Sequence, residues 1–92
     1  DDFASSFRKM LTIEQFRSEE MQKLYQQYLV SGPASYVKDL FESMGMIDAK
    51  EKADRFYAVM YFYYSIYDGT DDKERVKEEF VSAVNSMVQE LM

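Results

Sequence analysis

Carboxylates are the side chains in this sequence that come closest to a reactive cluster. Asp68, Asp71 and Asp72 lie within one short segment, and closely spaced carboxylate oxygens can bind Ca²⁺ or Mg²⁺. The segment lacks the alternating ligands and the terminal bidentate glutamate of a calcium-binding loop. We therefore expect the three aspartates to serve in a turn and a helix cap, and we predict no metal site.

Two absences restrict catalysis further. The sequence has no cysteine and no histidine, so thiolate chemistry, the usual zinc ligands and the commonest general base are all missing. It also contains no glycine-rich phosphate loop. We predict that the chain is not an enzyme, has no catalytic residue and needs no cofactor.

Tyrosine is the residue type that points to a binding site. Eight tyrosine rings bring hydroxyl groups that each need a hydrogen-bond partner when buried, which suits a pocket better than a dry core. Their faces, beside many acidic residues, would favour a cationic ligand. Alternatively, the hydroxyls reach the surface or bond to the backbone. The predicted pocket for a small hydrophobic or aromatic ligand comprises Phe16, Tyr25, Tyr28, Tyr36, Tyr57, Met60, Tyr61 and Tyr64.

Helices must position these residues. The sequence has only three glycines and one proline, and no segment alternates apolar and polar residues as a half-buried strand would. We therefore predict an all-α fold and a single domain, residues 1–92. We expect about five helices in an orthogonal or antiparallel bundle, at about residues 2–13, 18–31, 33–44, 48–67 and 70–92.

Local signals predict where the first three helices begin and end. Ser18 can cap the second helix, because its side chain can accept a hydrogen bond from a free N–H in the first turn. Gly32 and Pro33 predict a break or sharp kink, and we treat this pair as a candidate hinge. Gly45 is expected to end the third helix in a left-handed conformation.

The last two helices have their own start signals. Asp48 followed by Glu51 is close to a capping box, which predicts that the fourth helix starts there. Thr70 or Asp71 is expected to cap the fifth helix.

These two helices also carry more apolar surface than one packing partner would cover. At 100° per residue, the fourth helix has two apolar faces and the fifth has one unusually wide apolar arc. A four-helix interface between two copies would cover this surface, so we predict a homodimer. The alternative is that one small bundle buries all these residues. The predicted dimer interface comprises Val59, Phe62, Ile66, Val81, Val84, Val88, Leu91 and Met92.

Charge and hydropathy restrict the other partners. The formal net charge is −6, which should repel nucleic acid and anionic membranes. The longest apolar stretch, residues 56–67, is shorter than the roughly 20 residues that span a bilayer. No signal peptide is visible, and the lack of cysteine fits a reducing compartment, so we expect a cytoplasmic protein.

One resemblance covers essentially the whole chain. The run from Phe7 to Ser18, FRKMLTIEQFRS, resembles a segment of the C-terminal domains of tetracycline-repressor-type (TetR) transcriptional regulators from Gram-positive bacteria. Residues 21–28 followed by Gly32-Pro33, and the stretches 56–57 and 65–69, come in the same order as in that group. The resemblance implies a helical domain that binds a small-molecule effector and dimerises mainly through its last two helices.

The same resemblance implies a mechanism. DNA would be bound by an N-terminal helix-turn-helix domain that is missing from this chain, so this domain alone would not bind DNA. The effector would enter among the first four helices, shift their packing near Gly32 and Pro33, and change DNA binding by the intact repressor dimer. A ligand-free module that docks a partner helix is the alternative function, and it would show a groove lined by Met and Phe but no enclosed cavity.

Overall fold

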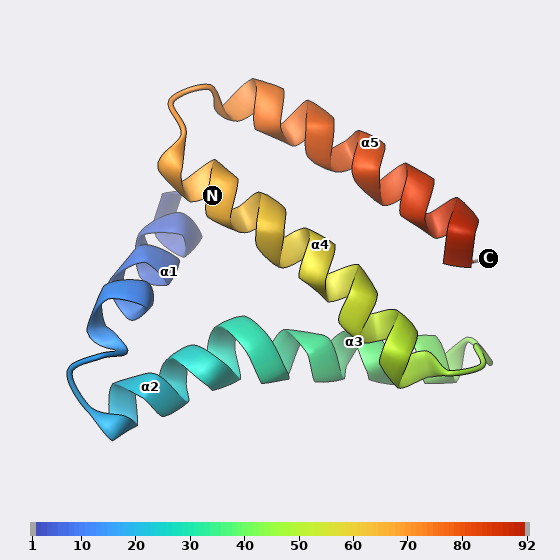
Figure 1. Ribbon diagram of the computed structural model, residues 1–92, viewed down its shortest axis with the longest axis horizontal. Helices are drawn as coiled ribbons and strands as arrows, with labels where there is room; N and C mark the ends of the chain where they lie inside the picture. Colours follow the sequence, from blue (N-terminus) through green and yellow to red (C-terminus); the bar gives the residue numbers. More distant parts are fainter. Residues whose placement is uncertain (1, 92) are drawn as a thin grey trace.

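The computed structural model describes residues 2–91 and is built entirely from helices. About 87% of the described residues are helical, and none of them lies in a strand. Five α-helices and one π-helical segment, here η1, follow each other along the chain (Figure 1). Their bounds are Asp2–Glu14 (α1), Glu19–Tyr25 (α2), Gln26–Ser31 (η1), Gly32–Ser43 (α3), Ala49–Gly69 (α4) and Lys73–Leu91 (α5).

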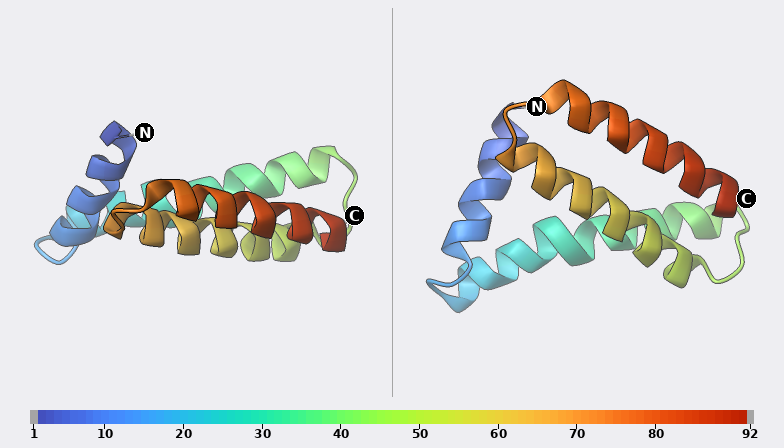
Figure 2. Two further views of the ribbon diagram at one scale, coloured as in Figure 1. Left: turned by 90° about the horizontal axis from the view of Figure 1, so that it is seen from above. Right: turned by 45° about the horizontal axis from the view of Figure 1, so that its top comes forward.

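The helices form a flat, open arrangement. In Figure 1, α1, the continuous run from α2 to α3, and α4 enclose a triangle, and α5 runs back along α4 on the side away from α3. Seen from above, α4 and α5 form one layer, and α1 and the end of α3 rise from one side of it (Figure 2). The molecule measures 39 × 32 × 16 Å, so it is less than two helix diameters thick.

Two small clusters hold the helices together. Leu11, Tyr25 and Leu29 join α1, α2 and η1. Phe41, Ala49 and Ala53 join α3 to α4, and Ala53 is completely buried, which lets the two helices approach closely.

The predicted break at Gly32 and Pro33 is wrong, because the chain continues from α2 into α3 without leaving the helical conformation. Ser31 and Gly32 both keep right-handed helical angles, and the N–H of Gly32 donates to the carbonyl of Gln27, a π-type bond. Pro33 falls in the first turn of α3, where a missing N–H is tolerated. The second and third predicted helices are therefore one continuous rod, and the chain forms four separate rods instead of five.

Two predicted caps are confirmed. The Ser18 side chain accepts a hydrogen bond from the Met21 N–H, at 3.1 Å. Gly45 follows α3 with φ at +76°, a left-handed conformation that glycine adopts without steric strain.

Two other predicted caps are wrong. Asp48 precedes α4 in a left-handed conformation and makes no capping hydrogen bond, so the capping box with Glu51 does not form. The side chain that caps α5 is Asp72, which accepts from the Arg75 N–H at 3.2 Å. The Thr70 hydroxyl accepts from the Asp72 N–H, which lies in the turn before α5.

The surface is larger than that of a compact monomer. The accessible area is 6584 Å², whereas a compact protein of this mass exposes about 5,600 Å². Large apolar side chains contribute to the difference, among them Phe16 at 85% and Phe3 at 78% exposure. The excess of about 1,000 Å² is comparable with what one partner buries in a standard protein interface. No helix in residues 2–91 has the length and apolar character needed to cross a membrane.

Candidate functional site

An apolar groove of about 530 Å³ lies between α1, η1, α3 and α4. Most of its lining is aromatic or aliphatic, and Arg8 is its one charged residue. The lining residues are Arg8, Tyr28, Leu29, Pro33, Tyr36, Val37, Leu40, Phe56, Tyr57, Met60 and Tyr64.

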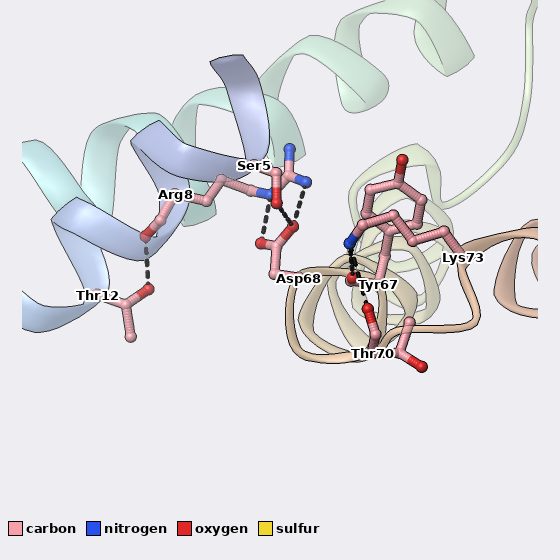
Figure 3. Close-up of polar contacts among 7 residues, drawn as sticks. All are labelled: Ser5, Arg8, Thr12, Tyr67, Asp68, Thr70 and Lys73. Atoms are coloured by element: carbon pink, nitrogen blue, oxygen red, sulfur yellow. Dashed lines mark hydrogen bonds and ion pairs between the residues drawn. The ribbon is translucent and has the colours of Figure 1, made fainter. Parts of the chain in front are cut away.

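Arg8 is held in place by Asp68, 60 residues further along the chain (Figure 3). Its Nε donates to Asp68 Oδ2 at 2.8 Å, and its Nη2 donates to Oδ1 at 2.6 Å. The Ser5 hydroxyl also donates to Oδ1, at 2.6 Å. Both side chains of the ion pair are only 13% exposed, and the two parallel bonds fix α1 to the last turn of α4. The aspartate predicted to serve in a turn is therefore an anchor between two helices.

The pKa values of this pair follow from the contact. Burial acts to raise the pKa of Asp68, but hydrogen bonds from Arg8 and Ser5, with the charge of Arg8, lower it overall. The hydrogen bond to Asp68 raises the pKa of Arg8 despite burial. The guanidinium also lies over the Tyr64 ring, 4.7 Å from its centroid. Arg8 and Asp68 are thus both charged at neutral pH.

Three tyrosine hydroxyls form hydrogen bonds within the protein. Tyr25 and Tyr61 share a hydrogen bond, and the Tyr57 hydroxyl donates to the backbone carbonyl of Leu29. Burial, helped by Tyr64 and Tyr61, raises the pKa of Tyr57 to about 12. The hydrogen bond with Tyr25, together with burial, raises the pKa of Tyr61 to about 12. The bond from Tyr57 to the backbone is the alternative that the sequence left open, whereas the bond between Tyr25 and Tyr61 joins two side chains and was not predicted.

The structure brings together five of the eight residues predicted to line a pocket. Two of the other three, Tyr25 and Tyr61, bond to each other and line no part of the groove. Phe16 lies beyond the end of α1, 85% exposed. The five that line the groove are Tyr28, Tyr36, Tyr57, Met60 and Tyr64.

A smaller cavity of about 210 Å³ lies between α4 and α5. Arg8 and Tyr64 line it as well as the groove, so these two side chains stand between the two spaces. Its other walls include Tyr63, which stacks on Phe80 of α5 with ring centroids 5.7 Å apart. This space is smaller than a drug-sized ligand requires.

The turn between α4 and α5 is held by one lysine. Lys73 Nζ donates to the carbonyl of Tyr67 at 2.8 Å and lies 4.3 Å from the centroid of the same residue's ring (Figure 3). It also reaches the Thr70 carbonyl, at 3.4 Å. Lys73 therefore fixes the angle at which α5 leaves α4.

The residues predicted to form the dimer interface do not share one face. Phe62 lies half a turn around α4 from Ala53, which is buried against α3, so it points away from the groove; it is 57% exposed. Lys77 lines the small cavity together with Arg8 of α1. Val81 lies one turn after Lys77, so it faces the same side of the α4–α5 layer as α1. Val59 and Ile66 share the side of Phe62, whereas Val84 and Val88 share that of Val81.

The end of α5 departs further from that prediction. Leu91 packs on the cluster of Phe41, Ala49 and Ala53 in its own chain. Met92 lies outside the described residues. The predicted single interface therefore separates into two apolar strips on opposite sides of the α4–α5 layer.

Sequence reasoning missed the Arg8–Asp68 pair. The two residues are far apart in the sequence, and helical spacing within α1 or α4 gives no sign that they meet. The one available signal was an arginine on the same side of α1 as Leu11 and Phe7, where a charge requires a partner.

Comparisons with known proteins identified no relative of this chain. No protein-family model, curated protein or solved structure significantly matches the chain. Within residues 2–91, no group of three carboxylate side chains could hold a metal ion.

Proposed function

We propose that this domain binds a small, largely apolar molecule in the groove between α1, η1, α3 and α4. The observation that carries the proposal is the groove itself, about 530 Å³ in volume with a lining of aromatic and aliphatic side chains and one fixed charged group. Ligand sites in proteins typically have this volume and this composition.

Separate hydrogen bonds hold the elements that form the floor and one end of the groove. Tyr57 is bonded to the Leu29 carbonyl across the floor, and Arg8 is bonded to Asp68 at one end. Tyr36, by contrast, is 71% exposed and Tyr28 48% exposed, so both rings keep surface that a ligand can cover. Because the floor is already fixed, its side chains lose little conformational entropy when a ligand binds, and the exposed aromatic rings offer surface to cover.

We further propose that the domain associates with a second copy of itself. The excess accessible area of about 1,000 Å² matches the area that one partner buries in a standard interface. The strip around Phe62 supports this, because it lies on the side of α4 opposite the groove and leaves the groove open. Self-association and ligand binding can then occur together.

The role in transcription is proposed from the resemblance to TetR-type regulators alone. In that role the domain would be cytoplasmic, would sense the effector and would transmit its presence to a DNA-binding domain outside this chain. The π-helical segment supports a coupling path, because Tyr28 and Leu29 line the groove while the same turn joins α2 to α3. An effector seated there contacts the point where two helices meet.

A thermal-shift screen of apolar and aromatic compounds tests ligand binding. A compound that binds the native groove raises the melting temperature further as its concentration increases above the Kd, roughly with the logarithm of that concentration. Met60→Trp, which fills the groove, should abolish the increase. Phe62→Ser, on the opposite side of α4, should leave it unchanged. An increase that survives in Met60→Trp would place the ligand elsewhere and reject the proposal.

The alternative function, a module that docks a partner helix, is favoured by one observation. Tyr36, Leu40 and Met44 follow each other at four-residue spacing along α3 as an exposed apolar stripe, and the first two also line the groove. A helix laid along this stripe would cover the groove as well. A screen without any hit, together with a monomer in solution, would favour this alternative.

A further inference from the structure

Arg8 has hydrogen-bond donors that the protein does not use. Its Nε and one N–H of Nη2 are engaged by Asp68. A guanidinium carries five N–H groups, so three remain, and no described residue accepts from them. Figure 3 shows the second terminal nitrogen pointing away from the carboxylate of Asp68. Arg8 is thus held by Asp68, keeps unused donors and contributes to the lining of the groove.

Other polar groups in the groove are less well placed to orient a ligand. The Tyr57 hydroxyl is committed to the Leu29 carbonyl. Tyr28 and Tyr36 carry their hydroxyls on rings that are 48% and 71% exposed, so water competes for them. Arg8 is therefore the one charged donor among the described residues that line the groove, and Asp68 holds it in place before a ligand arrives.

The charge around Arg8 decides what it can bind. Asp68 compensates its charge at close range, so an incoming carboxylate would gain little attraction and would be repelled by Asp68 and by a chain of net charge −6. A cation would meet the guanidinium directly, which contradicts the cationic ligand that the tyrosine faces suggested. An uncharged acceptor such as a carbonyl oxygen can bind the free N–H groups without either penalty.

The apolar walls determine the rest of the ligand. The guanidinium lies over the Tyr64 ring, and Met60 lies one turn earlier on the same side of α4. Across the groove stand Tyr36 and Leu40 of α3. A flat hydrophobic body between these walls would place an attached carbonyl at the arginine.

We propose that the groove selects uncharged aromatic or aliphatic compounds that carry a carbonyl group, and that Arg8 recognises the carbonyl oxygen. This inference rests on the proposed function, because it names the ligand class of the same groove. It assigns Arg8 two roles, one as the anchor between α1 and α4 and one as the specificity-determining donor.

Three probes with one naphthalene body test the inference by equilibrium dialysis. 2-Acetylnaphthalene carries an uncharged carbonyl, 2-ethylnaphthalene has no acceptor, and 2-naphthoate is an anion. We expect the ketone to bind about tenfold more tightly than the hydrocarbon, as a hydrogen bond from a charged donor provides. We expect the naphthoate to bind no more tightly than the hydrocarbon.

Variants show whether Arg8 causes the preference. Arg8→Lys keeps a positive charge beside Asp68 but loses the unused guanidinium N–H groups, so the ketone and hydrocarbon should bind equally. Lys77→Met removes a neighbouring cation outside the groove and should keep the tenfold preference. Met60→Ala should weaken all three probes alike. Because the three probes are compared on the unmodified protein, the test stands even if Arg8→Lys fails to fold.

The outcomes separate the two proposals. Equal binding of ketone and hydrocarbon, tightest binding of naphthoate, or a preference that persists in Arg8→Lys would overturn the role of Arg8 and leave the groove proposal standing. No binding of any probe would overturn both.

Discussion

The Tyr57 hydroxyl in α4 donates a hydrogen bond to the backbone carbonyl of Leu29 in the π-helical segment. In an α-helix that carbonyl would accept from the N–H four residues later, but this position is Pro33, which has no N–H. A side chain from a different helix thus replaces a bond that the backbone cannot make. The contact joins α4 to the turn where α2 becomes α3.

Removal of this hydroxyl should destabilise the fold. Tyr57→Phe leaves the ring in place but removes the donor to a buried carbonyl, which costs about 1 to 3 kcal/mol of unfolding free energy. Urea unfolding followed by circular dichroism measures the loss. Tyr36→Phe is the matched control, because Tyr36 is 71% exposed and no hydrogen bond involves its hydroxyl in the described residues. Equal stability of the two variants would contradict the role of Tyr57.

Alkaline titration should reveal Tyr57 and Tyr61. Both hydroxyls have a pKa of about 12 in the folded protein, above the ordinary value of about 10. Raised pKa values mean that their contribution to stability is complete below about pH 10 and is lost as the pH rises toward 12. Tyrosinate absorbance should show groups that ionise only near pH 12, and Tyr57→Phe should remove one of them. Ionisation of every tyrosine near pH 10 in the folded chain would reject this expectation.

The Arg8–Asp68 pair should make stability depend on pH on the acid side. The pKa of Asp68 is lowered in the folded state, so its contribution is complete above about pH 4, the value in the unfolded chain, and is lost as the pH falls through the folded-state pKa. Asp68→Asn should therefore lose about 1 to 3 kcal/mol at pH 7, because it leaves Arg8 without its charge partner. The difference from the unmodified chain should shrink below pH 4.

A surface pair provides the control for this experiment. Asp54 bonds to Lys50 at 2.8 Å, but both side chains are at least half exposed, so the pair should contribute little. Asp54→Asn should therefore leave the free energy of unfolding almost unchanged. A loss as large as that of Asp68→Asn would show that the effect comes from net charge.

Gly32 should not tolerate a side chain. A Cβ at this position would overlap with the Gln27 carbonyl oxygen, which accepts the π-type bond. Gly32→Ala must therefore shift the backbone at the π turn, and we expect lower stability and a blunted response to the groove ligand. Gly69→Ala is the control, since nothing lies within 4 Å of its added Cβ. Unchanged stability and ligand response in Gly32→Ala would show that the π turn is not the coupling element.

The parts of the fold that could be predicted are those with local causes. The cap at Ser18 and the left-handed turn at Gly45 each depend on neighbouring residues, and the structure confirms both. At Pro33 two local outcomes compete, because proline both interrupts a helix and fits its first turn. The Tyr57 hydroxyl favours the continuous helix, because it donates to the Leu29 carbonyl that Pro33 cannot pair. Leu29 and Tyr57 are too far apart in the sequence for local patterns to predict this contact.

The candidate site was only partly predictable for the same reason. Tyr57, Met60 and Tyr64 lie on one face of α4, so helical spacing groups them correctly. Tyr25 and Tyr61 were predicted to line the pocket because they are tyrosines, but their hydroxyls bond to each other. The division of the predicted dimer surface into two strips follows from the rotation of α5 against α4, which periodicity within each helix does not determine.

The most direct test of the account is a ¹H–¹⁵N NMR titration of the chain with 2-acetylnaphthalene. The account predicts shift changes at Arg8, Tyr28, Tyr36, Met60 and Tyr64, with the exposed side of α4 around Phe62 unaffected. Changes centred on the Phe62 strip, or none at saturating probe, would contradict the claim that the groove is the ligand site.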